Sequence, residues 1–221
     1  MADIRDNETV VVIGLGRFGS QVAESLIELG HEVLAIDEDL EIVQRMADRF
    51  THVVQADATD EEALRQLGVG EFRHAVVGIG GDIEASVLTV LALTELKVPE
   101  IWAKAVSGKH GRILERVGAD HVVYPEAAMG ERVAHLVTGK MIDFIEFDDD
   151  YAIAKTRAPR ELYGRTLRDA ALRSRYAVTV VGVKRPGADF IHATPQTTIH
   201  PGDLLIVSGP TRNVERFAAV T

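Results

Sequence analysis

The chain has no cysteine among its 221 residues. This excludes disulfide bridges, thiolate metal sites and a cysteine nucleophile, and it fits a reducing compartment. The chain also lacks an apolar run near the ~20 residues that cross a bilayer, and its first residues, MADIRDNE, are unlike a signal peptide. We therefore expect a cytoplasmic protein without direct membrane insertion, so that any role at a membrane works through a partner.

Positive charge is in short supply as well. The chain has 24 Lys and Arg against 34 Asp and Glu, a formal net charge of −10. Because nucleic-acid phosphates need a positive face, we expect no nucleic-acid partner. The hydrophobic content of 46% and the charged content of 26% are those of a globular protein, and the length permits one large domain or two small ones.

The most informative segment that is present is TVVVIGLGRFGSQVAESLIELGHEVLAID, residues 9–37. It predicts a buried strand over residues 9–13, a helix over 17–29 and a second strand over 32–36. Between the first strand and the helix, Gly14, Gly16 and Gly19 follow the spacing G-x-G-x-x-G. An acid, Asp37, ends the second strand. This order of elements is typical of a nucleotide-binding Rossmann unit.

Each residue of this motif has a physical role. Gly14 allows the tight turn, Gly16 lets the backbone approach a phosphate, and Gly19 packs the helix closely against the strand. The helix N-terminus offers free N–H groups and positive partial charge to a phosphate. Asp37 is placed to accept hydrogen bonds from ribose hydroxyls. We expect Phe18 to line the same site.

Alternating strands and helices continue after Asp37, and Asp60 and Gly68 are expected to cap the helix of residues 60–67. The predicted strands are 9–13, 32–36, 52–55, 75–77, 101–105 and 121–124. The predicted helices are 17–29, 40–50, 60–67, 82–96, 111–117 and 125 to about 140. This pattern predicts an α/β fold with a doubly wound parallel sheet over residues 7–140.

After residue 140 the pattern changes to a small α+β module, residues 141–221. Strands are predicted over 143–147, 151–156, 178–183, 188–192 and 203–208, and helices over 166–173 and 211–219. Turn signals stand at residues 185–187 and 200–203. His200 and Asp203 frame a Pro-Gly turn, and we expect them to cap it rather than to catalyse a reaction.

The helix of residues 83–96 is apolar over most of its circumference. Such a helix is normally covered on two sides. We expect a second subunit to bury the other side of this helix, in an interface that also includes the helix after Pro125. The alternative is a helix enclosed within one domain.

Nothing in the sequence assembles a catalytic constellation. The histidines are scattered without paired-ligand spacing, and Ser208-Gly209 lacks the surroundings of a nucleophile elbow. Arg17, inside the glycine loop, suits the terminal phosphates of a nucleotide, and Lys104 near the end of the fifth strand is a further candidate. These features favour ligand sensing over chemistry. An NAD-dependent oxidoreductase of Rossmann type remains the alternative, with NADP disfavoured because Asp37 would repel a 2′-phosphate.

Four segments carry a resemblance to a known family. They are IGLGRFG (13–19), ADAT (56–59), GADHVVYPE (118–126) and HPGD followed by LIVSG (200–209). The chain closely resembles the KtrA proteins, cytosolic gating subunits of Ktr potassium transporters and relatives of TrkA, which are built from RCK (regulator of potassium conductance) domains. The resemblance implies homodimers that assemble into an octameric ring under a KtrB-type potassium-translocating membrane subunit.

The resemblance also implies ligands. ATP and ADP, and in relatives NAD or NADH, would occupy the Rossmann cleft. Asp57 would sit near the adenine, with Ala58 and Gly80 lining the same site. Arg17 would reach the terminal phosphate from the adjoining subunit, and Glu126 would help bind a divalent or monovalent cation at the dimer interface.

Family members also bind cyclic di-AMP between two C-terminal lobes. Arg173 and Pro195 match positions that line that site. Two departures, Arg168 and Thr179, stand where the family usually has an apolar and an amide-bearing residue. Whether this second ligand binds here stays open at the level of the sequence.

Overall fold

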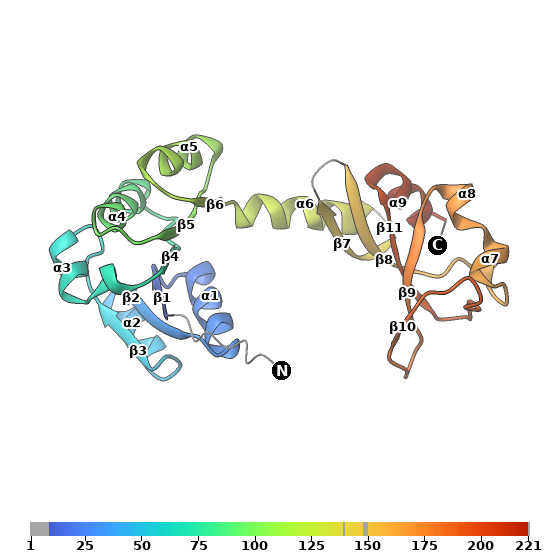
Figure 1. The fold of residues 1–221 in the computed structure, drawn as a ribbon, viewed down its shortest axis with the longest axis horizontal. Helices are drawn as coiled ribbons and strands as arrows, with labels where there is room; N and C mark the ends of the chain where they lie inside the picture. The colour runs from blue at the N-terminus through green and yellow to red at the C-terminus, as the bar shows by residue number, and fades with distance from the viewer. Residues whose placement is uncertain (1–8, 139, 148–149, 221) are drawn as a thin grey trace. The chain divides into compact units, whose positions relative to one another are not determined.

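The computed structural model describes residues 9–138, 140–147 and 150–220, and the chain divides into two compact units between Glu126 and Ala127 (Figure 1). The predicted domain ends at residues 7 and 221 lie outside these residues. Within the described part of the chain, no helix is both long and apolar enough to cross a bilayer.

The first unit contains a six-stranded parallel sheet with the order β3-β2-β1-β4-β5-β6. This confirms the predicted doubly wound fold. Its elements are β1 (Thr9–Ile13), α1 (Arg17–Glu28), β2 (Glu32–Asp37), α2 (Leu40–Met46), β3 (His52–Gln55), α3 (Glu61–Gln66), η1 (Val69–Glu71), β4 (His74–Val77), α4 (Ile83–Glu95), β5 (Glu100–Lys104), α5 (Gly108–Val117) and β6 (His121–Val123). The chain leaves β1 toward β2 and later returns to its other side as β4. The strand order therefore switches direction at β1, beside the end of β4.

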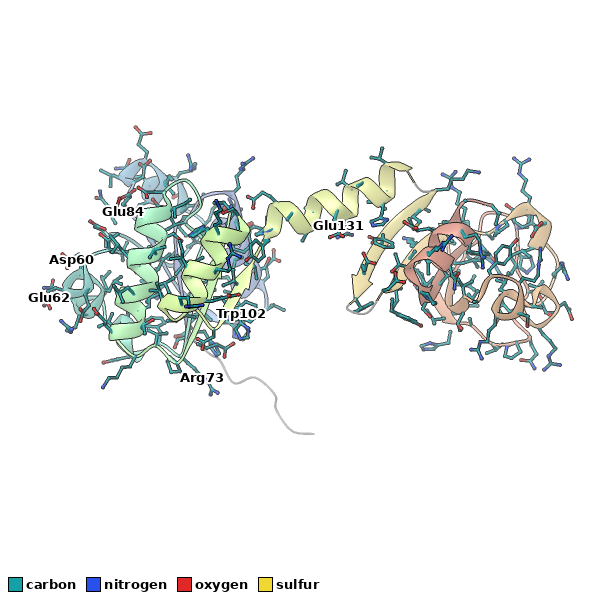
Figure 2. All side chains as sticks on the ribbon, turned by 90° about the horizontal axis from the view of Figure 1, so that it is seen from above. Asp60, Glu62, Arg73, Glu84, Trp102 and Glu131 are labelled. Carbon is teal, nitrogen blue, oxygen red and sulfur yellow. The ribbon has the colours of Figure 1, made fainter. Side chains whose placement is uncertain are left out.

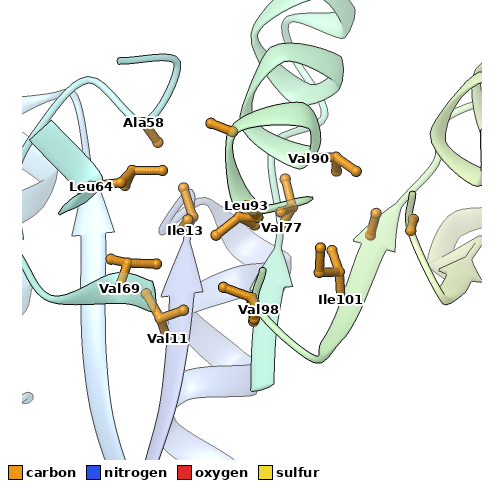
Figure 3. Packing of buried hydrophobic residues seen from close by; sticks show 14 of the residues in the cluster. Val11, Ile13, Ala58, Leu64, Val69, Val77, Val90, Leu93, Val98 and Ile101 are labelled. Atoms are coloured by element: carbon orange, nitrogen blue, oxygen red, sulfur yellow. The ribbon is translucent and has the colours of Figure 1, made fainter. Parts of the chain in front are cut away.

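Residues of β1 alternate between two cores, as the two-residue period of a strand requires. Val11 and Ile13 belong to a cluster with residues of α3, α4 and α5, which Figure 3 shows from close by. Val10 and Val12 belong to a second cluster with residues of α1 and α2. Both faces of the central strand are thus covered, which explains why its sequence is a continuous β-branched run.

One prediction about helix ends is confirmed and another is wrong. Asp60 caps α3 as predicted, because its Oδ1 accepts hydrogen bonds from Glu62 N at 2.9 Å and Ala63 N at 3.4 Å, and Gly68 has a φ of 72°. The helix predicted over 40–50 ends at Met46 instead. Phe50, beyond its end, is buried in the core with α1, so burial of that ring takes precedence over continuing the helix.

Helix α4 is covered on one side only within its unit. Val90 and Leu93 are fully buried, whereas Leu88 and Leu91 are 40% and 41% exposed. The alternative of a helix enclosed within one domain therefore does not hold for these side chains. A subunit interface stays a prediction.

The second unit begins within helix α6 (Pro125–Thr138), before the predicted boundary after residue 140. The later turns of α6 account for this. Leu136 packs against the core of the second unit, and the ring of His135 stacks on Phe144 with centroids 4.3 Å apart. These long-range contacts give no signal in the local sequence pattern.

The second unit contains a five-stranded antiparallel sheet with the order β10-β9-β11-β8-β7. Its elements after α6 are β7 (Met141–Phe147), β8 (Tyr151–Arg157), η2 (Arg160–Leu162), α7 (Leu167–Ala170), α8 (Leu172–Tyr176), β9 (Thr179–Lys184), β10 (Phe190–His192), β11 (Leu204–Pro210) and α9 (Thr211–Ala218). The α+β class is therefore as predicted.

The helix predicted over residues 166–173 is in fact two short helices, α7 and α8. They are separated by Ala171, whose φ is 49°. On a continuous helix, Ala170 and Leu172 would point about 200° apart. The break lets both side chains enter the same core, where they are 0% and 4% exposed.

Candidate functional site

A cleft of about 310 Å³ opens at the carboxyl ends of β1 to β4, beside the switch in strand order. This is the place where open α/β sheets bind their ligands. Of the residues predicted to bind the nucleotide, six line it: Gly14, Gly16, Asp37, Asp57, Ala58 and Gly80. Residues that were not predicted to bind the nucleotide complete the lining: Ile13, Glu38, Ala56, Thr59, Gly78, Ile79, Gly81, Asp82, Ala85 and Thr89.

The three motif glycines are needed for different reasons. Gly14 has a φ of 86°, a conformation that glycine adopts without strain. A Cβ on Gly19 would lie 1.9 Å from the carbonyl oxygen of Gly14, so only a glycine lets α1 approach the loop this closely. A Cβ on Gly16 would meet nothing within 4 Å, because this residue faces the open cleft.

Asp37 has a structural role in addition to the predicted one. It is only 8% exposed, and its Oδ2 accepts a hydrogen bond from Leu15 N at 2.6 Å while Oδ1 accepts one from Asp39 N at 3.0 Å. The carboxylate thereby ties the glycine loop to the end of β2. Each oxygen keeps a further lone pair for a ligand.

Asp57 stands at the end of β3 with its carboxylate oriented by Thr59. Asp57 Oδ1 accepts hydrogen bonds from Thr59 Oγ1 at 2.7 Å and from Thr59 N at 2.9 Å. These two bonds, the hydroxyl first, lower the pKa of Asp57 below its usual value. The carboxylate is therefore fixed and ionised at neutral pH, ready to accept a hydrogen bond.

Five predicted residues lie outside the cleft lining: Arg17, Phe18, Gly19, Lys104 and Glu126. Lys104 Nζ donates a hydrogen bond to Glu126 Oε1 at 2.6 Å and lies 5.8 Å from the ring centroid of Phe18. The bond to Lys104, and after it the local backbone and the charges of Lys104 and Arg17, lower the pKa of Glu126. The predicted cation ligand Glu126 is therefore paired with a lysine in this structure.

Gly80 lines the cleft and also lies next to Lys104 of the Lys104–Glu126 pair. A Cβ on Gly80 would come within 3.1 Å of Lys104 Nζ, so a larger residue would crowd the ammonium group. Phe18 lines a separate apolar cavity of about 420 Å³ together with Val76 and Trp102, the last of which is labelled in Figure 2. Arg17 is exposed at the start of α1.

Thr89 is a site residue that sequence reasoning missed. It lines the cleft from α4 and is 0% exposed, and its hydroxyl has no hydrogen-bond partner among the described residues. Ser86, one turn earlier, is buried and unpartnered in the same way. The available signal was two hydroxyl residues three positions apart within residues 85–93, which are otherwise apolar. Thr89 therefore lies against the cleft with its hydroxyl oxygen buried.

A second cavity, of about 520 Å³, lies in the second unit between α7, α8, β9 and the segment before residue 196. Arg173 and Pro195, the residues predicted to bind a second ligand, both line it. The two departures Arg168 and Thr179 also line it, and Arg173 Nε and Nη2 donate to Thr179 Oγ1 at 3.3 and 3.2 Å. The structure therefore brings together all four residues.

Asp203 caps the HPGD turn, as predicted. Asp203 is fully buried, and its Oδ2 accepts a hydrogen bond from His200 N at 2.9 Å. Arg185 donates to both carboxylate oxygens, through Nε at 3.0 Å and Nη2 at 3.2 Å. Burial alone raises the pKa of Asp203, but these hydrogen bonds and the neighbouring charges outweigh it and leave the pKa lowered.

Comparison with known proteins assigns the chain to a family. The model of the TrkA-N domain matches residues 10–125, and that of the TrkA-C domain matches residues 154–220. This chain belongs to the TrkA-N and TrkA-C domain family. It is 37% identical to the Ktr system potassium uptake protein A of Bacillus subtilis (strain 168) over 212 residues, 96% of each chain. It is 39% identical to the Ktr system potassium uptake protein C of the same organism over 207 residues, which is 93% of this chain and 94% of that one.

Solved structures agree on the fold of this TrkA-type chain. The GsuK RCK domain superposes with a TM-score of 0.66 and 18% identity, covering 100% of this chain and 48% of that one. The GsuK channel bound to NAD gives a TM-score of 0.64 at 18% identity, with coverage of 96% and 39%. At this level of identity the likeness establishes the fold alone. The predicted resemblance to the Ktr potassium uptake proteins is confirmed by the sequence identities and the two domain matches.

Proposed function

We propose that this chain is the nucleotide-binding regulatory subunit of a potassium uptake system and is not an enzyme. The observation that carries the proposal is the cleft at the switch in strand order, with the glycine loop on one side and Asp37 and Asp57 at its edge. The identity to Ktr system potassium uptake proteins over nearly the whole chain supplies the transport role.

ATP and ADP are the ligands proposed for this cleft, with NAD or NADH as alternatives in the same place. The glycine loop would bind phosphates through its backbone N–H groups, Asp37 would bind the ribose, and Asp57 with Ala58 would bind the adenine. The ionised, Thr59-oriented carboxylate of Asp57 suits the amino group of adenine. Asp37 disfavours a nucleotide with a 2′-phosphate.

The rival function, an NAD-dependent oxidoreductase, has less support. Such an enzyme needs an acid, a base or an anchoring cation beside the hydride position. The described residues that line the cleft include no histidine, lysine, arginine or tyrosine, and of its four carboxylates Asp37, Asp57 and Asp82 already accept hydrogen bonds from the protein. Gating needs no such group, because a nucleotide that binds one conformation more tightly shifts the equilibrium toward it.

Isothermal titration calorimetry with ATP, ADP, NADH and cyclic di-AMP on the purified chain tests the proposal. We expect purine nucleotides to bind, and ATP to increase potassium flux in vesicles that carry a KtrB-type membrane subunit. Absence of any nucleotide binding, or NADH turnover with a small substrate, would contradict it. Cyclic di-AMP is proposed to bind the cavity around Arg173 and Pro195.

The assembly proposed is a homodimer that forms an octameric ring on the inner face of the membrane beside its partner. Apolar side chains that the single chain leaves exposed support an interface on α4 and α6: Ile83, Leu88 and Leu91, and Met129, Val133 and Val137. Light scattering at micromolar concentration should therefore give a mass above that of the monomer. A monomer with and without nucleotide would contradict the interface.

Arg17 is expected to distinguish ATP from ADP. Its guanidinium is exposed and lies outside the lining of its own chain's cleft, so we propose that it reaches the γ-phosphate bound by the adjoining subunit. A charge-assisted hydrogen bond contributes about 1.5–3 kcal/mol. Arg17→Ala should therefore weaken ATP binding by about 10- to 100-fold and leave ADP binding nearly unchanged, as measured by calorimetry.

Glu126→Gln should likewise weaken ATP binding more than ADP binding, because Glu126 is proposed to hold a cation beside the nucleotide once Lys104 is displaced. Neither Arg17→Ala nor Glu126→Gln should activate potassium flux with ATP. Arg73→Ala is the matched control, since this exposed arginine precedes β4 at the opposite end of the sheet (Figure 2). Equal losses for ATP and ADP, or full ATP activation of both variants, would refute the assignment.

A further inference from the structure

Three potential metal ligands of the second unit converge, far along the chain from the nucleotide cleft. They are Glu131 and His135 on α6, and Glu146 on β7, and one donor atom of each lies within 4.8 Å of the others. Figure 2 labels Glu131 on its helix. The donor set is mixed, an imidazole nitrogen with two carboxylates, and is thus more than a group of surface acids.

Regular secondary structure places these side chains. Glu131 and His135 are four residues apart on α6 and share one face of it. Glu146 is two residues from Phe144 on β7 and shares one face of that strand. The stacking of His135 on Phe144, at 4.3 Å between centroids, holds the helix face against the strand face. Glu131 and Glu146 both line the cavity of about 230 Å³ between them.

Helix α9 places a polar side chain against two of the three ligands. His135 Nδ1 lies 2.9 Å from Glu215 Oε1, and Thr211 Oγ1 donates to Glu146 Oε1 at 2.7 Å. Because Nδ1 of His135 faces Glu215, Nε2 is the ring nitrogen whose lone pair would bind a metal ion. A carboxylate behind a metal-binding histidine is the usual outer partner of such a ligand.

The neighbouring cation does not neutralise the cluster. Arg132 follows Glu131 directly and lines the same cavity, but its guanidinium is hydrogen-bonded to Asp143. That bond is the first cause of the lowered pKa of Asp143. Two carboxylates close to each other and to an imidazole are therefore left to attract a cation.

We propose that Glu131, His135 and Glu146 form a binding site for a divalent transition-metal ion, with Zn²⁺ as the best match. Imidazole together with carboxylate oxygens suits Zn²⁺ and its first-row neighbours, whereas Mg²⁺ and Ca²⁺ prefer oxygen ligands alone. Three protein ligands leave room for water. The ion would connect α6 to β7 within the second unit, and it is separate from the cation proposed at Glu126.

The test is calorimetric titration of Zn²⁺ into the full-length, tag-free and nucleotide-free chain after treatment with a chelator. We expect binding of one ion per chain and a rise in melting temperature on addition of Zn²⁺. Glu131→Gln and Glu146→Gln should each weaken binding by about tenfold or more, and the double variant should lose both the binding and the thermal shift. Titration of Co²⁺ should give visible d–d absorption that the double variant lacks.

Glu115→Gln is the matched control, because it removes one carboxylate from an exposed position on α5 in the other unit. Glu131 is itself exposed, so its glutamine variant is expected to fold, which far-UV circular dichroism checks. No Zn²⁺ binding by the wild-type chain would overturn the proposal. So would an affinity that Glu131→Gln and Glu146→Gln leave unchanged, which would indicate adventitious surface binding.

Discussion

Replacing Gly16 with valine is expected to weaken ATP and ADP binding by about 10- to 100-fold, equivalent to 1.5–3 kcal/mol, while the protein still folds. A side chain at this position meets no protein atom within 4 Å, and the φ of −63° is ordinary for any residue. The valine methyl groups would instead occupy cleft volume where the loop backbone is proposed to approach phosphate. Calorimetry for affinity and thermal melting for folding separate the two effects.

Gly19→Ala is the matched control within the same motif, with the opposite expectation. Its Cβ would lie 1.9 Å from Gly14 O, a contact that forces the loop and α1 apart. We expect the first unit of this variant to lose its cooperative melting transition. Undiminished nucleotide affinity in Gly16→Val would exclude the glycine loop as the phosphate site.

Asp203→Ala is expected to lower the free energy of unfolding of the second unit by about 3 kcal/mol, since it removes a buried carboxylate that accepts three hydrogen bonds at once. Without it, His200 N loses its acceptor and the β9–β11 end of the sheet loses its connection to Arg185. Denaturant unfolding measures the loss. Asp203→Asn keeps an acceptor for His200 N, so its free energy of unfolding should lie between those of the wild type and Asp203→Ala.

The same carboxylate predicts an acid dependence with a definite direction. Because the pKa of Asp203 is lower in the folded than in the unfolded chain, its contribution to stability is present above the unfolded value of about 3.9. It is lost as the pH falls through the folded value. Wild type and Asp203→Ala should therefore converge in stability in acid below about pH 4. A constant difference down to pH 2 would contradict this account of the turn.

Much of the cleft was predictable because its signals are local. The positive φ of Gly14 and the close approach at Gly19 follow from chain geometry within a few residues, and the glycine spacing encodes both. The cap of α3 at Asp60 is equally local. The alternation of strands and helices determined the sheet class, because a right-handed crossover rule leaves few topologies open.

The remaining features depend on contacts between distant segments. The break at Ala171 and the early end of α2 arise because burial of Leu172 and Phe50 outweighs local helix propensity. The division of the chain inside α6 likewise follows from packing of Leu136 on strands that come later in the chain.

By itself, the sequence determined the family, the two kinds of fold along the chain and the glycine turn that lines the cleft, since each depends on short motifs or on the alternation of strands and helices. Only the tertiary structure decided which polar groups from distant parts of the chain lie next to one another. Lys104 donates a hydrogen bond to Glu126, 22 residues later in the chain, and Asp37 accepts one from the backbone N–H of Leu15. His135 on α6 lies close to Glu146 on β7. Side-chain pairing at such separations is set by how helices pack on sheets, and no periodicity along the chain records it.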